Sequence, residues 1–314
     1  SSENGLSQNT IMSILQDHKG NMWFSTWDGI NKFDGYSFRK YKARLDNKIT
    51  LSHNRIDYMG EDKYGFIWLL TYDNHVYRFN PKTEFFERVP AGNQVGSTIA
   101  VTKIIILNNG VVWLLTDSEG AIRVITDPGD YNLTSEWYSS QKKSFPIVRA
   151  FNVYQDLMGN EWVLTNNGLG KIRIGEYSPA FYFAENDELH KKTAGQSFYS
   201  CLESGAQLYF GSDGGRVWCY QKNTGRFNLL KMPTDFRIVA IGGLGTKEMI
   251  FVTDKDGFFV YTLKTKLIEH YPASLFPASS IISAYVDKSF EVWFEQHVPG
   301  KVVKAGDKTY SFSI

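Results

Sequence analysis

The sequence has few cysteines and no long apolar run. Only Cys201 and Cys219 occur among 314 residues, which is too few for a disulfide framework or a cysteine metal cluster. We expect both to be reduced side chains in the core. No apolar run is longer than five residues, as at 111–115, whereas a membrane-spanning helix needs about 20. The sequence therefore predicts no membrane span.

The chain also has no clear excess of basic or of acidic residues. The chain has 34 basic and 33 acidic residues, for a net charge of +1. Proteins that grip nucleic acid by neutralising phosphates usually carry a clear basic excess, so we expect no nucleic acid as a partner. Catalytic and phosphate-binding motifs are absent, and no two of the six histidines lie at metal-ligand spacing. The sequence thus predicts no catalytic residues, no metal and no cofactor in this chain.

What the chain does contain is a repeat. The first copy, residues 11–26, reads as an apolar strand, an acidic residue, a glycine and a second strand that begins with tryptophan. The tryptophan position recurs at Trp23, Trp68, Trp113, Trp162, Tyr209, Ile250 and Trp293. The successive spacings are 45, 45, 49, 47, 41 and 43 residues, which average 45. Seven such copies account for the whole chain.

Two further positions keep step with the tryptophan. An acidic residue lies six positions before it at Asp17, Asp62, Asp156, Glu203 and Asp287, and is replaced by Leu107 and Leu244 in two copies. A glycine lies three positions before it at Gly20, Gly65, Gly110 and Gly159. Glycine at this place favours a tight turn with positive φ between two paired strands.

Each copy contains four short runs of β-type composition, for example 56–59, 67–71, 75–79 and 85–89. Four strands repeated every 45 residues predict an all-β fold, a seven-bladed β-propeller of four-stranded antiparallel blades. We expect one propeller over 1–314, with blades at about 9–45, 54–90, 100–140, 147–185, 196–232, 236–272 and 279–314. The innermost strands should begin near Thr10, Arg55, Ala100, Arg149, Gln196, Arg237 and Ser280, with contiguous sequence in every blade. The repeated aromatic residues should fill the space between blades.

The first copy resembles a known repeat. The segments 5–9, 11–26 and 28–35 carry the Leu-Ser, Asn, strand, Asp, Gly, Asn, Trp, Thr, Gly string of the two-component regulator propeller family. The second and fourth copies match well, the latter through Asp156, Gly159, Asn160, Trp162, Thr165 and Gly168, while the others are degraded. The resemblance extends over essentially the whole chain.

This resemblance implies the N-terminal periplasmic sensor propeller of a Bacteroides-type hybrid two-component system, anchored in the inner membrane. It implies a glycan-derived oligosaccharide as the ligand and signalling to a histidine kinase outside this segment. A second propeller and further domains would follow in the same protein, and the full-length sensor would be a homodimer. This chain itself is then not an enzyme. The sequence does not decide whether the ligand site lies within this propeller or between propellers.

Binding residues are expected where the turn after each second strand meets the loop before the first strand. In this position lie Trp27, Asp28, Tyr72, Asp73 and Asn166. Aromatic faces with a few oriented polar groups are typical of sugar sites. Asp and Asn are also ordinary turn formers, and a purely structural role stays open for Trp27 and Tyr72 as well.

A shared register singles out three arginines. Thirteen positions before the repeated aromatic residue, copies two, four and six carry Arg55, Arg149 and Arg237. Three guanidinium groups near one channel mouth would favour a carboxylate or sulfate, and hence an acidic glycan. The alternative is that each arginine pairs with a nearby aspartate.

Two other functions remain open at this point. Propellers commonly serve as protein-interaction scaffolds, because fold does not determine function. A propeller carbohydrate-active enzyme would gather distant residues at its channel mouth without a local motif. Binding of a small oligosaccharide would distinguish the sensor from the scaffold.

Overall fold

The computed structural model describes residues 5–43, 51–90, 99–141, 146–175, 179–183, 195–244 and 247–275, and the backbone of four strands between 281 and 313. The chain consists of two compact units, Ser1–Gln155 and Asp156–Ile314. Strands dominate both units, and the helix of the described part is η3 (Ala273–Leu275), a single 3₁₀ turn. Among the described residues, no helix has the length and apolar character needed to cross a membrane.

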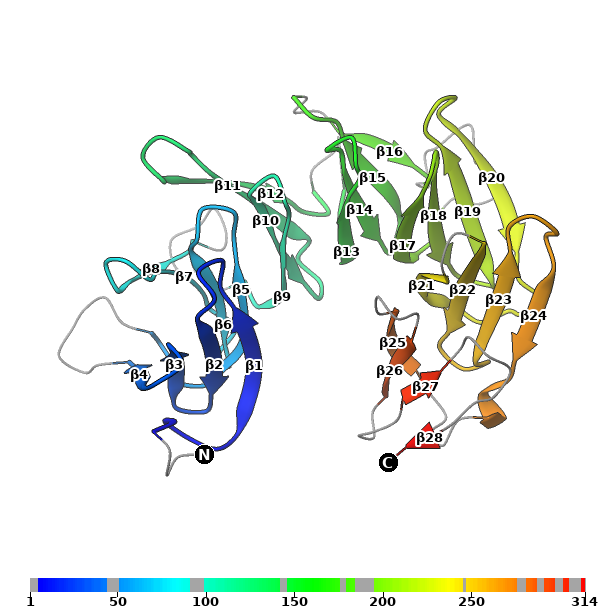
Figure 1. Cartoon of the computed structure of the whole chain (residues 1–314). Coiled ribbons are helices and arrows are strands. Elements are labelled where there is room, and N and C mark those ends of the chain that lie inside the picture. Colours follow the sequence, from blue (N-terminus) through cyan, green and yellow to red (C-terminus); the bar gives the residue numbers. More distant parts are fainter. Residues whose placement is uncertain are drawn as a thin grey trace. The chain divides into compact units, whose positions relative to one another are not determined.

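The strands form seven four-stranded sheets, each built from four consecutive strands (Figure 1). The first sheet holds β1 (Ile11–Gln16), β2 (Met22–Thr26), β3 (Gly29–Phe33) and β4 (Phe38–Tyr41). The second holds β5 (Ile56–Glu61), β6 (Ile67–Thr71), β7 (Val76–Asn80) and β8 (Phe85–Arg88). The third holds β9 (Val101–Ile106), β10 (Val111–Thr116), β11 (Ala121–Thr126) and β12 (Leu133–Tyr138). The fourth holds β13 (Ala150–Gln155), β14 (Glu161–Thr165), β15 (Gly168–Ile172) and β16 (Ala180–Tyr182).

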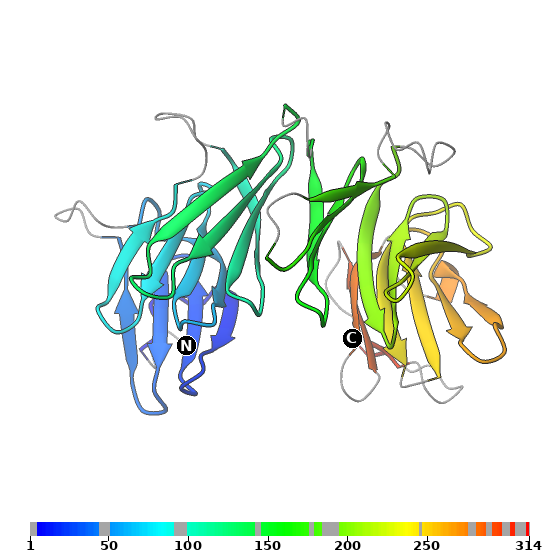
Figure 2. The ribbon, with the colours of Figure 1, turned by 90° about the horizontal axis from the view of Figure 1, so that it is seen from above.

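The remaining three sheets belong to the second unit. The fifth holds β17 (Phe198–Ser204), β18 (Gln207–Ser212), β19 (Arg216–Gln221) and β20 (Arg226–Lys231). The sixth holds β21 (Ile238–Leu244), β22 (Glu248–Thr253), β23 (Phe258–Thr262) and β24 (Ile268–Tyr271). The seventh holds β25 (Ile281–Val286), β26 (Glu291–Gln296), β27 (Val302–Lys304) and β28 (Phe312–Ser313). Figure 2 shows the strands of the first six as separate twisted sheets, coloured from blue to orange.

This architecture confirms the predicted fold class, a seven-bladed β-propeller with antiparallel blades of contiguous sequence. The first strands begin one residue after the predicted positions, or two in the fifth sheet. They also lie beside one another in successive sheets, as β1 with β5, β5 with β9, β17 with β21 and β21 with β25. In these blades the first strand is therefore the innermost strand.

The acidic residue and the glycine of the repeat shape the turn between the first two strands. Asp17 Oδ1 accepts hydrogen bonds from the backbone N–H of Lys19 (3.0 Å) and Asn21 (2.8 Å), and its Oδ2 accepts from Trp23 Nε1 at 2.9 Å. Gly20 has φ 84°, as the turn requires. The predicted positive φ is confirmed at all four glycines, with 83°, 88° and 85° at Gly65, Gly110 and Gly159.

The hydrophobic core lies between neighbouring sheets. Trp23 of the first blade is fully buried and packs edge-on against Phe79 of the second, with ring centroids 5.8 Å apart. Ile56, Leu69 and Phe86 complete the same cluster. The repeated aromatic positions are buried in the first six blades, as predicted, while the Trp293 side chain lies outside the described residues.

The expectation for the cysteines needs one correction. Both Cys201 and Cys219 are free thiols, and Cys219 is buried in the core between the fifth and sixth sheets. Cys201 is only partly buried by its exposed surface, although burial and the nearby Glu203 raise the pKa of its thiol well above the usual value. Burial raises the pKa of the Cys219 thiol to about 12.

Candidate functional site

Six side chains gather where the first two blades meet, at the ends of β2 and β6. We call them the Arg55 cluster: Met12, Trp27, His53, Arg55, Asp57 and Tyr72. Trp27 follows β2, Tyr72 follows β6, and Arg55 directly precedes β5. The predicted turn and register positions therefore do converge in space within the first unit.

Arg55 lies against both aromatic rings. Its guanidinium carbon is 4.3 Å from the Tyr72 ring centroid and 5.6 Å from that of Trp27. The rings are 55% and 51% exposed, respectively, although large aromatic side chains are usually buried. A cation held against aromatic faces is favourable in itself, and the outer surfaces of the two rings remain open to a ligand.

Backbone and side-chain contacts hold this arrangement in place. The Tyr72 N–H donates to the Arg55 carbonyl at 3.0 Å, and the Arg55 N–H donates to His53 Nδ1 at 2.9 Å. The His53 ring lies 5.5 Å from that of Tyr72, and Trp27 Nε1 donates to the sulfur of Met12 at 3.3 Å. The site is thus preorganised without a ligand.

Arg55 also forms an ion pair within its own blade. Its Nε donates to Asp57 Oδ1 at 2.8 Å, and both side chains are about one-third exposed. Asp57 sits at a β-bulge, because the β5–β6 register shifts between Ile56 and Tyr58. A bulge re-aims the extra side chain, and here it turns Asp57 toward Arg55. The guanidinium retains its Nη groups for further hydrogen bonds, so the pair does not use all of its donors.

The other two arginines are paired as well. Arg149 Nη2 lies 3.1 Å from Asp117 Oδ1, and its guanidinium carbon is 5.2 Å from the Phe151 ring centroid. In the second unit, Arg237 Nε and Nη2 donate to Asp254 Oδ2 at 2.9 and 2.8 Å. The alternative left open by the sequence, pairing with nearby aspartates, is therefore present for all three arginines. Arg55 and Arg149 belong to the first unit and Arg237 to the second, and their joint action on one ligand stays a prediction.

Arg237 has an aromatic neighbour of its own. Its guanidinium carbon lies 5.5 Å from the ring centroid of Tyr199, whose hydroxyl donates to Asp213 Oδ1 at 2.7 Å. Partial burial lowers the pKa of Arg237, but the hydrogen bond and charge of Asp254 outweigh it, so the pKa lies above its usual value. Arg237 is consequently a fixed positive charge.

The predicted polar turn residues are already engaged. Asp28 forms an ion pair with Lys42 and accepts a hydrogen bond from Asn54 Nδ2 at 3.4 Å. Asp73 accepts from Thr71 Oγ1 at 2.5 Å and contacts His75 Nδ1 at 2.9 Å. Burial raises the pKa of Asp73, but these hydrogen bonds prevail and hold it below the usual value.

In the second unit, Asn166 contributes its backbone carbonyl, which accepts from Ser197 Oγ at 3.2 Å. Its place after β14 is the predicted one. No cluster of three or more histidine, cysteine or acidic side chains with metal-binding geometry occurs in the described part of the chain.

Sequence reasoning did not identify three members of the Arg55 cluster: Met12, His53 and Asp57. Met12 and Asp57 both occupy the extra position of a bulge at the start of an innermost strand. Tyr199 has the same bulge position in the fifth blade, beneath Arg237. Met12, Asp57 and Tyr199 lie at a nearly constant distance before the repeated aromatic residue. This shared register in the sequence could therefore have indicated them.

Comparison with known proteins confirms the predicted repeat. The family model described as the two-component regulator propeller matches residues 5–28. The chain is 42% identical over 48 residues to a protein named histidine kinase P4 from Formosa agariphila, a match that covers 15% of this chain and 4% of that protein.

Solved structures share the fold. The extracellular domains of two putative hybrid two-component systems of B. thetaiotaomicron each align with a TM-score of 0.57, at 19% and 20% identity. The alignments cover 92% and 94% of this chain but only 37% and 39% of those chains. The chain thus spans about two fifths of the two-component structures it matches.

Proposed function

We propose that this chain is a ligand-sensing propeller of an extracytoplasmic two-component sensor. The ligand is an oligosaccharide released from a glycan, and the Arg55 cluster binds it. One observation carries the proposal: the Arg55 guanidinium lies between two half-exposed aromatic rings contributed by adjacent blades.

The chemistry of the cluster suits a sugar. Trp27 and Tyr72 offer flat apolar faces, each more than half exposed, on which a pyranose ring can stack. Arg55 supplies hydrogen-bond donors next to both faces, and a guanidinium makes bidentate contacts with a carboxylate or sulfate. The ion pair with Asp57 offsets part of the charge, so neutral hydroxyl-rich ligands are accommodated and acidic ones favoured.

The proposal extends to the rest of the protein. The repeat at 5–28 and the likeness to extracellular domains of two-component systems support a sensor that signals to a histidine kinase outside this segment. The chain covers about two fifths of those extracellular domains, which agrees with a second propeller and further domains in the same protein. We place this sensor region in the periplasm and propose that the full-length protein acts as a homodimer.

Calorimetry with oligosaccharides tests the binding role. Neutral, uronate-bearing and sulfated oligosaccharides are titrated into the wild-type chain and into Trp27→Ala, Tyr72→Ala and Arg55→Ala. Each substitution should weaken binding by about 1.5–3 kcal/mol, the scale of a charged hydrogen bond or a stacked ring. Melting temperatures should change little, because all three side chains lie at the surface.

Matched controls separate this site from general surface effects. Tyr36→Ala removes an aromatic residue that is 96% exposed in a first-blade turn, and Arg88→Ala removes an exposed arginine of β8. Neither should change affinity. If no oligosaccharide binds, or if the two controls weaken binding as much as Tyr72→Ala and Arg55→Ala, the proposal is wrong.

A further inference from the structure

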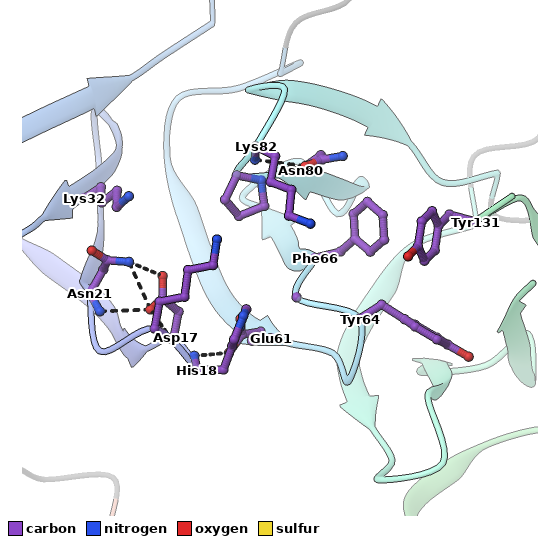
Figure 3. Close-up of a pocket in the computed structure, with 13 residues that line it drawn as sticks. Asp17, His18, Asn21, Lys32, Glu61, Tyr64, Phe66, Asn80, Lys82 and Tyr131 are labelled. Carbon is purple, nitrogen blue, oxygen red and sulfur yellow. Dashed lines mark hydrogen bonds and ion pairs between the residues drawn. The ribbon is translucent and has the colours of Figure 1, made fainter. Parts of the chain in front are cut away.

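A cavity lies at the opposite strand ends of the first two blades from the Arg55 cluster. It has a volume of about 280 Å³ and is formed by the turns β1–β2 and β5–β6, with the β7–β8 turn and Tyr131 of the third blade (Figure 3). Every residue that lines it belongs to the first unit. The Arg55 cluster uses the other ends of β2 and β6, so the two sites share no residue.

Three lysines line this cavity: Lys19, Lys32 and Lys82. Within the described part of the chain, none of their Nζ atoms forms an ion pair or a hydrogen bond, and Lys32 Nζ only faces the Trp23 ring at 5.7 Å. The three ammonium groups outnumber the two carboxylates that line the same cavity, Asp17 and Glu61, so the lining keeps a net positive charge that attracts an anion.

The two carboxylates at the cavity are already satisfied. Asp17 is 7% exposed, and both of its oxygens accept hydrogen bonds, from Asn21 and from Trp23. Glu61 accepts from the His18 N–H at 2.8 Å and contacts His18 Nδ1 at 2.5 Å (Figure 3). The groups left to meet a ligand are therefore the ammonium groups.

The fourth blade has a lysine, Lys171, at the position that Lys32 occupies in the first blade. Lys171 pairs across the sheet with Trp162 as Lys32 does with Trp23. It is only 8% exposed, and its Nζ donates to Tyr220 Oη at 3.2 Å. Tyr220 packs edge-on against Trp162 as Phe79 packs against Trp23.

One difference between the two blade junctions is a hydroxyl group next to the lysine. At the first junction, Phe79 occupies the place of Tyr220 and offers Lys32 no oxygen. The Lys32 ammonium consequently lines an open cavity, whereas the Lys171 ammonium is buried with a partner.

Aromatic rings form the wall facing these charges. Tyr131 is 45% exposed, and its ring centroid lies 5.3 Å from that of Phe66 and 5.9 Å from that of Tyr64. Arg78, itself 5% exposed, holds the wall in place, because its Nη2 donates to the Tyr131 carbonyl at 2.7 Å and its guanidinium packs on Phe66 at 4.4 Å. Tyr131 has φ 61°, a backbone conformation that costs free energy and persists only when neighbours enforce it.

We propose that this cavity binds a small acidic sugar or a similar ring-bearing anion. Its acidic group lies at the ammonium groups of Lys32 and Lys82, and its ring lies against Tyr131. The volume is near the lower end of small-molecule sites, about 300 Å³, which favours a ligand of one or two rings. This inference is independent of the proposed function, because it uses neither the Arg55 cluster nor any signalling role.

Calorimetry with simple hexose derivatives tests the site. The probes are glucose 6-sulfate, glucose 6-phosphate, glucuronate, neutral glucose and inorganic sulfate. We expect the acidic hexoses to bind, glucose not to bind, and inorganic sulfate to bind more weakly than glucose 6-sulfate because it makes no ring contact. Lys32→Met and Lys82→Met should each weaken binding of the acidic hexoses by about tenfold or more.

Two further variants sharpen the test. Phe79→Tyr leaves the charge unchanged but gives Lys32 the hydroxyl partner that Lys171 has, so it should also weaken binding. Lys40→Met removes an exposed lysine of β4 that does not line the cavity, and it should bind as the wild type does. The titrations are repeated in the Arg55→Ala background, where the other site is disabled. Acidic hexoses should still bind there, and Lys32→Met and Lys82→Met should still weaken that binding. Melting temperatures verify that every variant is folded.

The inference is overturned by any of three results. The first is no binding of an acidic hexose at about 10 mM, the weakest affinity of interest here. The second is equal weakening by Lys40→Met and Lys82→Met, which indicates nonspecific charge attraction. The third is loss of binding in Arg55→Ala alone, which assigns the anion to the Arg55 cluster instead. Because Lys82 is an exposed turn residue, its substitution gives a decisive result even if a core variant fails to fold.

Discussion

The indole nitrogen of Trp23 donates a hydrogen bond to Asp17 Oδ2 at 2.9 Å, six residues earlier in the chain. The same bond joins Trp68 to Asp62 at 2.8 Å and Trp162 to Asp156 at 2.9 Å. Each tryptophan is fully buried, so its polar N–H needs an acceptor within the protein. The acidic residue of the repeat thus accepts hydrogen bonds both from the backbone of the turn and from the buried indole.

Replacing one of these aspartates should strongly destabilise the protein. Asp156→Ala leaves the buried Trp162 N–H and the turn amides of Met158 and Asn160 without an acceptor. We expect the free energy of unfolding to fall by about 2–4 kcal/mol. Asp235→Ala, at a carboxylate that is 101% exposed, should change it by less than about 0.5 kcal/mol. Urea denaturation measures both, and equal midpoints would contradict the role assigned to Asp156.

Lowering the pH should reduce the free energy of unfolding, because Asp17 in the first blade becomes protonated. Burial raises its pKa, but the hydrogen bonds from Trp23 and Asn21 prevail and hold the pKa below the usual 3.8. Because the folded-state pKa is depressed, the stabilisation is complete above the unfolded-state pKa of about 3.9 and is lost as the pH falls through the folded-state pKa. Asp17→Asn does not titrate, so its free energy of unfolding should fall less between about pH 4 and pH 2. Parallel pH profiles of the two proteins would refute this.

Substitutions at Gly20 and Gly120 should distinguish the free-energy cost of backbone strain from that of steric overlap. Gly20 has φ 84° and open space where a Cβ would lie, so Gly20→Ala should cost only the strain of the left-handed conformation, about 1 kcal/mol. Gly120 has φ 94°, and a Cβ there would lie 1.9 Å from the Tyr138 carbonyl oxygen. Gly120→Ala should therefore cost about 3 kcal/mol or more. Thermal or chemical denaturation measures both. If the two substitutions lower the free energy of unfolding equally, the strand that carries Tyr138 moves aside at little cost and the prediction is wrong.

The Arg237–Asp254 pair should contribute modestly to stability. Its side chains are 50% and 13% exposed, so a double-mutant cycle with Arg237→Ala and Asp254→Ala should give a coupling of about 1 kcal/mol. Salt should reduce the coupling, because the pair is reached by solvent. A coupling near zero would leave the arginine available for a ligand, and would favour the joint action predicted for Arg55, Arg149 and Arg237.

Much of the fold was predictable because its signals are local. The spacing of the repeated aromatic residue counts the blades, and glycine three residues before it marks a turn that only a positive φ closes. Strand periodicity then places the innermost strands to within two residues. The convergence of Trp27, Arg55 and Tyr72 also followed from the repeat, since equivalent positions in adjacent blades are neighbours.

The sequence by itself determined the fold class, the blade register and the aromatic residues that fill the space between blades, because these depend on periodicity and on turn chemistry. The tertiary structure alone decided the ion pairs of the arginines and the cavity at Lys32. Asp57 meets Arg55 because a bulge turns it. Among the described residues, Lys32 Nζ has no hydrogen-bond partner, and Phe79 of the next blade offers it no hydroxyl. Lys32 and Phe79 lie about 45 positions apart in sequence, so side-chain packing between blades sets their relationship. Arg55 and Asp57 are close in sequence, but only the bulge decides that their side chains meet.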